Sequence, residues 1–263
     1  MSKRLVIFSA LLAFSAGGLR QGARAEDMAV RNEELLDKLV AAYPDFLASH
    51  QGNSLRWKDG TEMAFDDGKG GKDFAMRLDA PDLEDEFYVS YPVGRAGIPP
   101  GTDIDPGRVR YEPFFAKMYG DCQKAGVAGK LVDIVWLPKH GGKRIKITAV
   151  NGVAARLQAV SDELDRLPES FMHDLTPSGG TYNCRVIAGT SRRSVHGYGA
   201  AIDINVAASD YWMNSRTVGG QYPYKNRIPW EIVEIFEKHG FIWGGKWYHY
   251  DTMHFEYRPE LLP

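Results

Sequence analysis

Two histidines and two aspartates in the last third of the chain have the types and spacing needed for metal chemistry. Asp203 follows His196 by seven residues, and Asp251 precedes His254 by three. Imidazole nitrogens and carboxylate oxygens are ligands that Zn²⁺ prefers, and three protein ligands leave the fourth tetrahedral position for water. His196, Asp203 and His254 are therefore candidate ligands for one zinc ion per chain.

The residues around His196 and Asp203 support this interpretation. Gly197 and Gly199 allow the backbone to approach a bulky group closely, and Asp203 interrupts an otherwise apolar segment, 200–206. An acidic side chain in such a segment must be paired or bound to a metal. A salt-bridged core residue is the alternative for Asp203, and we favour the metal ligand.

A hydrolytic metal site also needs a group that moves protons, and Asp251 is placed to act as general base and then as general acid. His249, five residues before His254, is a rival both for binding the metal and for facing the bound water. The HExxH helix signature is absent from the sequence, which disfavours a thermolysin-like enzyme. No GxSxG motif surrounds a serine, so nucleophilic catalysis has little support.

Hydrolysis of a peptide creates an oxyanion, which a cation or a preorganised donor must stabilise. Arg185, upstream of His196 on an expected strand, is the first candidate. Arg192 and Arg193 are alternatives, although arginines in a loop beside Ser194 are more simply solvent-facing or substrate-binding.

The combined pattern resembles the family of D-alanyl-D-alanine carboxypeptidases and L-alanyl-D-glutamate endopeptidases. The resemblance covers roughly 146–263, and its motifs are Arg185, Gly189-Thr190, Ser194-Val195-His196 with Gly199-Ala200 and Asp203, Trp243-Gly244-Gly245, and Asp251-Thr252-Met253-His254-Phe255-Glu256. Members often have proline where this chain has Met253, a difference that affects backbone rigidity more than chemistry.

The resemblance implies an enzyme that cuts the stem peptides of bacterial peptidoglycan. It implies zinc on His196, Asp203 and His254, with Asp251 as catalytic acid/base and an arginine at Arg185. The compact stretch 189–205 favours the L-alanyl-D-glutamate endopeptidase, with the D-alanyl-D-alanine carboxypeptidase as the alternative. Other residues expected to bind substrate or to position the ligands are Ser194, Trp243, Trp247, His249 and Glu256.

A non-catalytic zinc module is a further alternative, since a related fold in hedgehog proteins is used for binding. Asp251 distinguishes the peptidase from the non-catalytic module, because a purely structural or binding site has no need of a base beside an open metal position.

The elements that must position these residues indicate an α+β fold, with a central antiparallel sheet, flanking helices and an N-terminal helical and hairpin extension. Helices are expected at 29–47, 114–119, 153–167 and after Pro229. A hairpin is expected around Asp59-Gly60. Strands are expected at 131–137, 184–188, 200–206 and 254–257. We divide the chain into 26–145, of unknown function, and a peptidase domain, 146–263.

The N-terminus has the order of features of a secretory signal peptide: Lys3 and Arg4, an apolar run over 5–14, and small residues ending at Ala25. Ten apolar residues are about half of the roughly 20 that span a bilayer. We therefore expect cleavage after Ala25, no stable membrane insertion afterwards, and an exported protein that is periplasmic or secreted.

Removal of residues 1–25 takes away four of the 32 basic side chains and leaves 28 against 34 acidic ones, a net charge of −6. This charge argues against a nucleic-acid partner. The chain has two cysteines, Cys122 and Cys184, for which a disulfide and two buried thiols are both possible. We expect a monomer.

Overall fold

The computed structural model describes residues 30–263, and the expected signal peptide lies outside these residues. Residues 30–42 are helical. The other helices are α2 (Phe74–Asp79), α3 (Glu112–Tyr119), α4 (Val153–Leu164), α5 (Met172–Leu175) and α6 (Trp230–Lys238). The strands are β1 (Leu47–Gln51), β2 (Ser54–Trp57), β3 (Glu62–Ala64), β4 (Leu131–Trp136), β5 (Lys143–Thr148), β6 (Ala201–Asp203), β7 (Phe241–Trp243) and β8 (His254–Tyr257). No helix within 30–263 has the length and apolar character required to cross a membrane.

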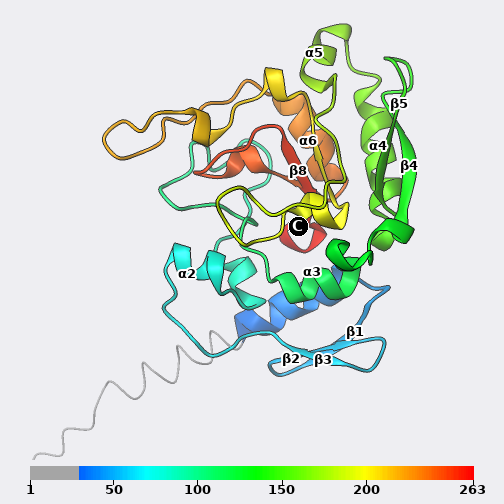
Figure 1. Cartoon of the computed structure of the whole chain (residues 1–263). Helices are drawn as coiled ribbons and strands as arrows, with labels where there is room; N and C mark the ends of the chain where they lie inside the picture. Colours follow the sequence, from blue (N-terminus) through cyan, green and yellow to red (C-terminus); the bar gives the residue numbers. More distant parts are fainter. Residues whose placement is uncertain (1–29) are drawn as a thin grey trace, which may run out of the picture.

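The strands form separate small antiparallel sheets in place of the single central sheet expected from the sequence. Within 30–263 the strand orders are β1-β2-β3, β4-β5 and β6-β8-β7. The second and third sheets meet through one backbone hydrogen bond, from the Thr148 amide to the Gly199 carbonyl. Gly199 lies in the left-handed turn just before β6, and β6 itself pairs with β8. Helices beside small antiparallel sheets are consistent with the α+β class (Figure 1).

The first helix ends earlier than the expected 29–47. Helical structure stops at residue 42, and Leu47 begins β1. Pro44 explains the difference, because it cannot donate a backbone hydrogen bond and it disfavours helical geometry at the residue before it. The hairpin that follows pairs Leu55 with Met63, as the turn residues predict.

The expected strand at 184–188 is wrong. This segment belongs to a loop whose ladder contact is an isolated bridge between Val186 and Arg193. Val186 is 43% exposed, so its side chain has no core to pack against. An apolar run without a neighbouring strand does not form a sheet, because its amide groups find too few partners.

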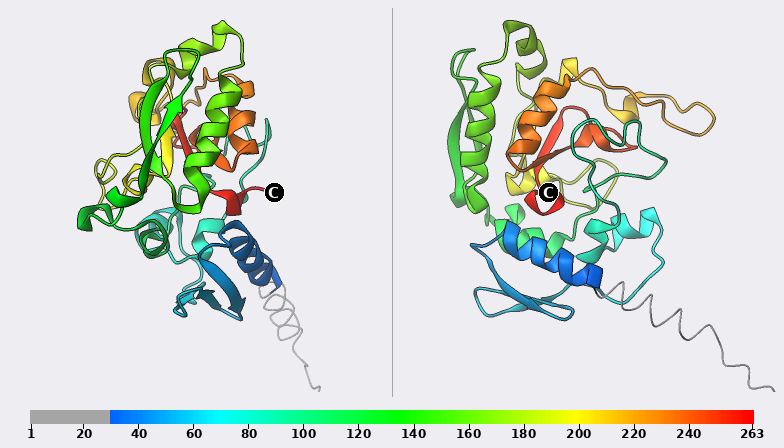
Figure 2. Two further views of the ribbon diagram at one scale, coloured as in Figure 1. Left: turned by 90° about the vertical axis from the view of Figure 1, so that its right-hand side faces the viewer. Right: turned by 180° about the vertical axis from the view of Figure 1, so that it is seen from behind.

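The N-terminal region and the C-terminal region share one hydrophobic core. The cluster of buried side chains continues from Leu36 and Trp57 through Phe114 and Phe115 to Phe255. The proposed boundary between 145 and 146 falls inside β5, which pairs along its whole length with β4. Figure 2 shows the first helix and β1–β3 packed beneath α3, close to the C-terminus.

A buried guanidinium group joins these two regions. The Arg258 side chain is fully buried, and it donates to the Glu86 carboxyl at 2.7 Å, the Glu256 carboxyl at 3.3 Å and the Gly107 carbonyl at 2.7 Å. Glu260 pairs with the same guanidinium and accepts from the Tyr43 hydroxyl. Burial, opposed by Arg258, raises the pKa of Glu86 to about 8, which limits the negative charge that the core must hold.

A disulfide connects Cys122, just after α3, to Cys184 in the loop that carries Arg185. It encloses a segment that contains β4, β5 and α4. A cross-link of this sequence separation restricts the unfolded chain, and so it stabilises the folded state by chain entropy.

Replacement of Arg258 by Met should lower the free energy of unfolding by about 3–5 kcal/mol, because the buried carboxyl groups around it lose their shared cation. Urea unfolding measures the change. Arg144→Met is the matched control, since Arg144 is exposed on β5. Equal stability of the two variants would contradict a structural role for Arg258.

Candidate metal centre

Strand pairing brings Asp203 and His254 together. Asp203 ends β6 and His254 begins β8, and the two residues are directly opposite in the antiparallel register. Side chains of opposed residues project from the same face of a sheet. The Asp203 Oδ1 and His254 Nδ1 atoms are 3.1 Å apart.

His196 reaches the same point from the turn that precedes β6. It lies in a 3₁₀ turn, Val195–Tyr198, which Gly199 ends in a left-handed conformation with φ +67°. A Cβ atom at Gly199 would lie 2.8 Å from Leu131 and 3.2 Å from the Thr148 amide nitrogen. The glycine therefore lets the turn pack against β4 and β5 and direct His196 toward Asp203.

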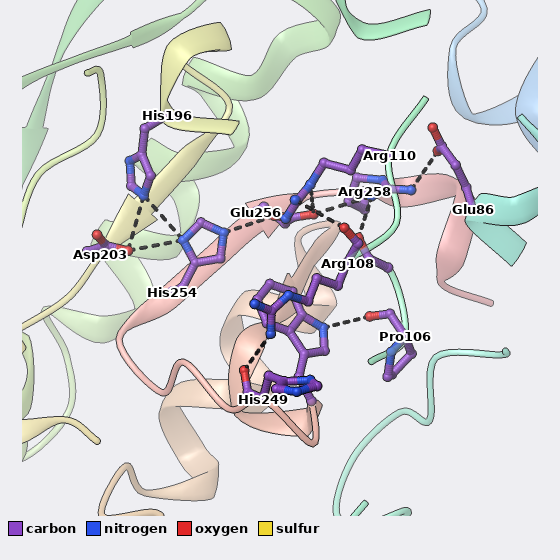
Figure 3. A network of polar contacts seen from close by, with 12 residues as sticks. Glu86, Pro106, Arg108, Arg110, His196, Asp203, His249, His254, Glu256 and Arg258 are labelled. Carbon is purple, nitrogen blue, oxygen red and sulfur yellow. Dashed lines mark hydrogen bonds and ion pairs between the residues drawn. The ribbon is translucent and has the colours of Figure 1, made fainter. Parts of the chain in front are cut away.

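Hydrogen bonds on the far side of each imidazole ring determine which nitrogen faces the centre. His196 Nδ1 donates to the Thr181 carbonyl at 2.6 Å, and His254 Nε2 donates to the Glu256 carboxylate at 2.9 Å. In neutral rings, the His196 Nε2 and His254 Nδ1 atoms therefore carry lone pairs. Figure 3 shows both atoms converging on Asp203.

The converging atoms have the spacing of ligands around one metal ion. His196 Nε2 is 3.2 Å from both His254 Nδ1 and Asp203 Oδ1. Bonds of about 2.0 Å from a tetrahedral zinc ion place its ligand atoms about 3.3 Å apart. Three acceptors this close repel one another unless a cation lies between them. The residues present therefore fit a divalent metal ion.

The electrostatics of the three side chains agree with a site built for positive charge. Burial raises the pKa of the Asp203 carboxyl, but hydrogen bonds from His196 and His254 in their protonated forms outweigh this effect and hold the pKa well below the usual range. Burial lowers the pKa of His254, but contacts with Asp203 and Glu256 reverse this and raise it to about 10.

Asp251 lies in the same cavity, outside the three-residue group. Its Oδ1 atom is buried and has no hydrogen-bond partner among residues 30–263. Burial raises the pKa of Asp251 to about 6; the Asp203 charge adds to this effect and the His254 charge opposes it. The side chain can therefore take up and release a proton near neutral pH.

The cavity at the centre has a volume of about 110 Å³, and its wall includes most of the other expected site residues. Arg185 is exposed at its edge, where its side chain contacts the Val186 carbonyl at 3.4 Å. The remaining expected residues in the wall are Ser194, Trp247 and His249. The Trp247 ring lies 5.7 Å from the His254 ring.

Two expected residues lie behind the site. Trp243 is fully buried and its indole N–H donates to the Thr252 carbonyl at 2.9 Å, which positions the segment leading into His254. Glu256 is also fully buried, where it orients His254 and accepts from Arg110 at 3.1 Å. Neither residue lines the cavity, so a direct contact with substrate is not supported for them.

His249 lies in an aromatic wall, outside the group of converging ligands. Its Nδ1 atom pairs with Asp105 at 2.8 Å, and its ring stacks on Phe74 at a centroid distance of 5.6 Å. These contacts hold the ring from two sides. They disfavour the alternative in which His249 replaces one of the three ligands.

The structure adds residues that the sequence did not single out. Arg108, Arg110 and Tyr211 also line the cavity, and Asp105 holds Arg108 at 3.2 Å. The first two flank buried Val109, in the segment between Pro106 and Pro113. The alternation of these two arginines around an apolar residue is the only feature of the sequence that marks them. It does not indicate that they lie beside His196 and His254.

Comparison with known families finds one match in the part of the chain that carries this centre. The model described as D-alanyl-D-alanine carboxypeptidase matches residues 188–257. The match supports the family expected from the motifs, and that family is zinc-dependent in general. No curated protein and no solved structure matches the chain.

We expect the purified chain to bind one divalent metal ion, and His196→Ala, Asp203→Ala and His254→Ala each to abolish stoichiometric binding. Each change leaves two of three ligands, too few for a stable catalytic site. Metal analysis after dialysis measures the content. His173→Ala is the control, because the side chain of His173 is 71% exposed. Full metal content in all three variants would place the ion elsewhere.

Proposed function

Residues 188–257 belong to the D-alanyl-D-alanine carboxypeptidase family of zinc peptidases, and from this membership we propose that the chain is a zinc-dependent peptidase of peptidoglycan stem peptides. The observation that carries the proposal is the convergence of three lone-pair atoms beside the Asp251 Oδ1 atom, which is buried and has no hydrogen-bond partner within 30–263. His196, Asp203 and His254 would hold the ion. Bound zinc supplies Lewis acidity and lowers the pKa of water to about 7.

Asp251 is the proton-transfer group in this proposal. A general base must accept a proton from the attacking water and then deliver it to the leaving amine. The buried environment of Asp251 favours this role, since it raises the pKa toward neutrality and leaves Oδ1 free. A non-catalytic zinc module does not need such a group, so Asp251 favours the enzyme.

Arg185 is the candidate for binding negative charge at the reacting carbonyl. Among residues 30–263 its guanidinium group makes one weak contact, with the Val186 carbonyl. The free donors of an arginine at a cavity edge can stabilise an oxyanion or a substrate carboxylate.

The surrounding cavities favour an endopeptidase over a carboxypeptidase. Two further cavities, of about 310 and 450 Å³, share Arg108 with the cavity at the centre. A terminal dipeptide would leave much of this space empty, whereas an extended stem peptide can occupy it. We therefore favour cleavage of the L-alanyl-D-glutamate bond, with removal of terminal D-alanine as the alternative.

Peptidoglycan is located outside the cytoplasmic membrane, so this function requires export. The signal-peptide pattern at 1–25 supports export. We propose a periplasmic or secreted location on this basis.

Asp251→Ala should keep the metal and lose hydrolysis by about 10²–10⁴-fold, because the three ligands remain while proton transfer is lost. Metal content and cleavage of peptidoglycan fragments are measured on the same preparation. His249→Ala is compared with it as the rival. An active Asp251→Ala beside a metal-loaded, inactive His249→Ala would show that the base is His249.

Digestion of purified muropeptides distinguishes the two bonds. Mass spectrometry should detect products separated between L-alanine and D-glutamate. Release of free D-alanine as the sole small product would establish the carboxypeptidase alternative. The Asp251→Ala protein is the matched control for contaminating activity.

A further inference from the structure

A second cavity beside the metal centre carries an excess of positive charge. It has a volume of about 310 Å³, and four arginines but only two carboxylates line it: Arg108, Arg110, Arg192 and Arg193 against Asp79 and Glu112. Arg108, Arg110 and Ile187 also line the cavity at the metal centre. The two spaces are therefore neighbours with a common wall.

Two of these arginines are already paired with protein groups. Arg110 pairs with the Glu256 carboxylate through Nε and Nη2. Arg193 contacts Asp121 at 3.2 Å, Gln123 at 3.3 Å and the Cys122 sulfur at 3.0 Å. Neither needs a ligand to satisfy its charge.

The other two keep unused donors. Arg108 donates through Nη1 to Asp105 and to the His249 carbonyl, and no hydrogen bond within 30–263 uses its Nε or Nη2. Arg192 Nε is buried without a hydrogen-bond partner in the described chain. The nearest carboxylate, on Asp79, is 3.7 Å away and 76% exposed. A weakly paired guanidinium that is mostly buried costs free energy.

Arg108 and Arg192 line the same two cavities, of about 310 and 450 Å³, so their side chains border a common space. Burial, followed by repulsion from Arg108, lowers the pKa of Arg192. Two cations held near each other, with donors unused, are typical of an anion site. Arginine forks match the planar geometry of a carboxylate in particular.

We propose that Arg108 and Arg192 form a subsite for a carboxylate group of the substrate, one residue or more from the bond that is cut. This inference rests on the proposed peptidase function, and it gives the N-terminal region a role in specificity. Arg108 comes from outside the family match at 188–257, and Arg192 from inside it. The carboxylate is supplied either by the end of the stem peptide or by an internal acidic residue.

Calorimetric binding to the full chain, dialysed free of metal so that no hydrolysis occurs, tests the subsite. The ligands are a stem tripeptide with free carboxylates and two analogues, amidated at the terminal or at the internal carboxylate. One amidation should weaken binding to the wild-type chain about tenfold, as expected for loss of a charge-assisted hydrogen bond. The analogue that binds weakly identifies the source.

Arg192→Gln should bind the free tripeptide about tenfold more weakly than the wild-type chain does. It should also no longer distinguish this tripeptide from the amidated analogue that the wild-type chain binds weakly. Arg192→Lys should recover part of the difference, because it keeps the charge without the fork. Arg144→Gln, on exposed β5, is the control and should behave like wild type. Thermal unfolding of each variant verifies folding.

The proposal is overturned if the wild-type chain binds all three ligands equally or binds none of them, or if Arg192→Gln keeps the full difference. These outcomes do not depend on hydrolysis. A wild-type chain that distinguishes the ligands but cleaves no muropeptide would contradict the peptidase function and leave the subsite in place.

Discussion

The buried Arg258 guanidinium is the interaction on which the rest of the structure depends. It places a positive charge at the end of β8 and surrounds it with carboxyl groups from both ends of the chain. Such a charge is tolerated in a core only when its donors are paired. The N-terminal region therefore has to fold onto the C-terminal sheet, because Glu86 supplies one of those partners.

The same network extends to the metal centre through Glu256. This carboxylate contacts Arg258 and Arg110 on one side and His254 on the other. Arg110 holds Glu256 in its ionised form despite burial, since the nearby charges lower its pKa. The orientation of a candidate ligand is thus determined by arginines, one of which belongs to the region before the family match (Figure 3). This dependence explains why the N-terminal region shares a core with the site.

The sequence predicts the local parts of this arrangement well. The helix around Ile232 and Phe236, the hairpin at Asp59-Gly60 and the family motifs all depend on residues close in the chain. The hydrogen bond from Arg258 to the Glu86 carboxyl joins residues 172 positions apart, and no periodicity or spacing in the sequence indicates it. The prediction of a strand at 184–188 is wrong for the same reason, because strand formation depends on a neighbouring strand that the local sequence does not specify.

The pairing of β6 with β8 has a consequence for folding. A slip of one residue would place Asp203 opposite Phe255 and would turn its neighbours toward the wrong face, because strand side chains alternate. The error would separate Asp203 from His254, so the three groups would no longer converge. A bound cation stabilises only the conformation that offers all of its ligands. A cation at the candidate centre would therefore stabilise the conformation in which β6 and β8 are correctly aligned. A conformation with a shifted register would lack this stabilisation and would unfold more readily.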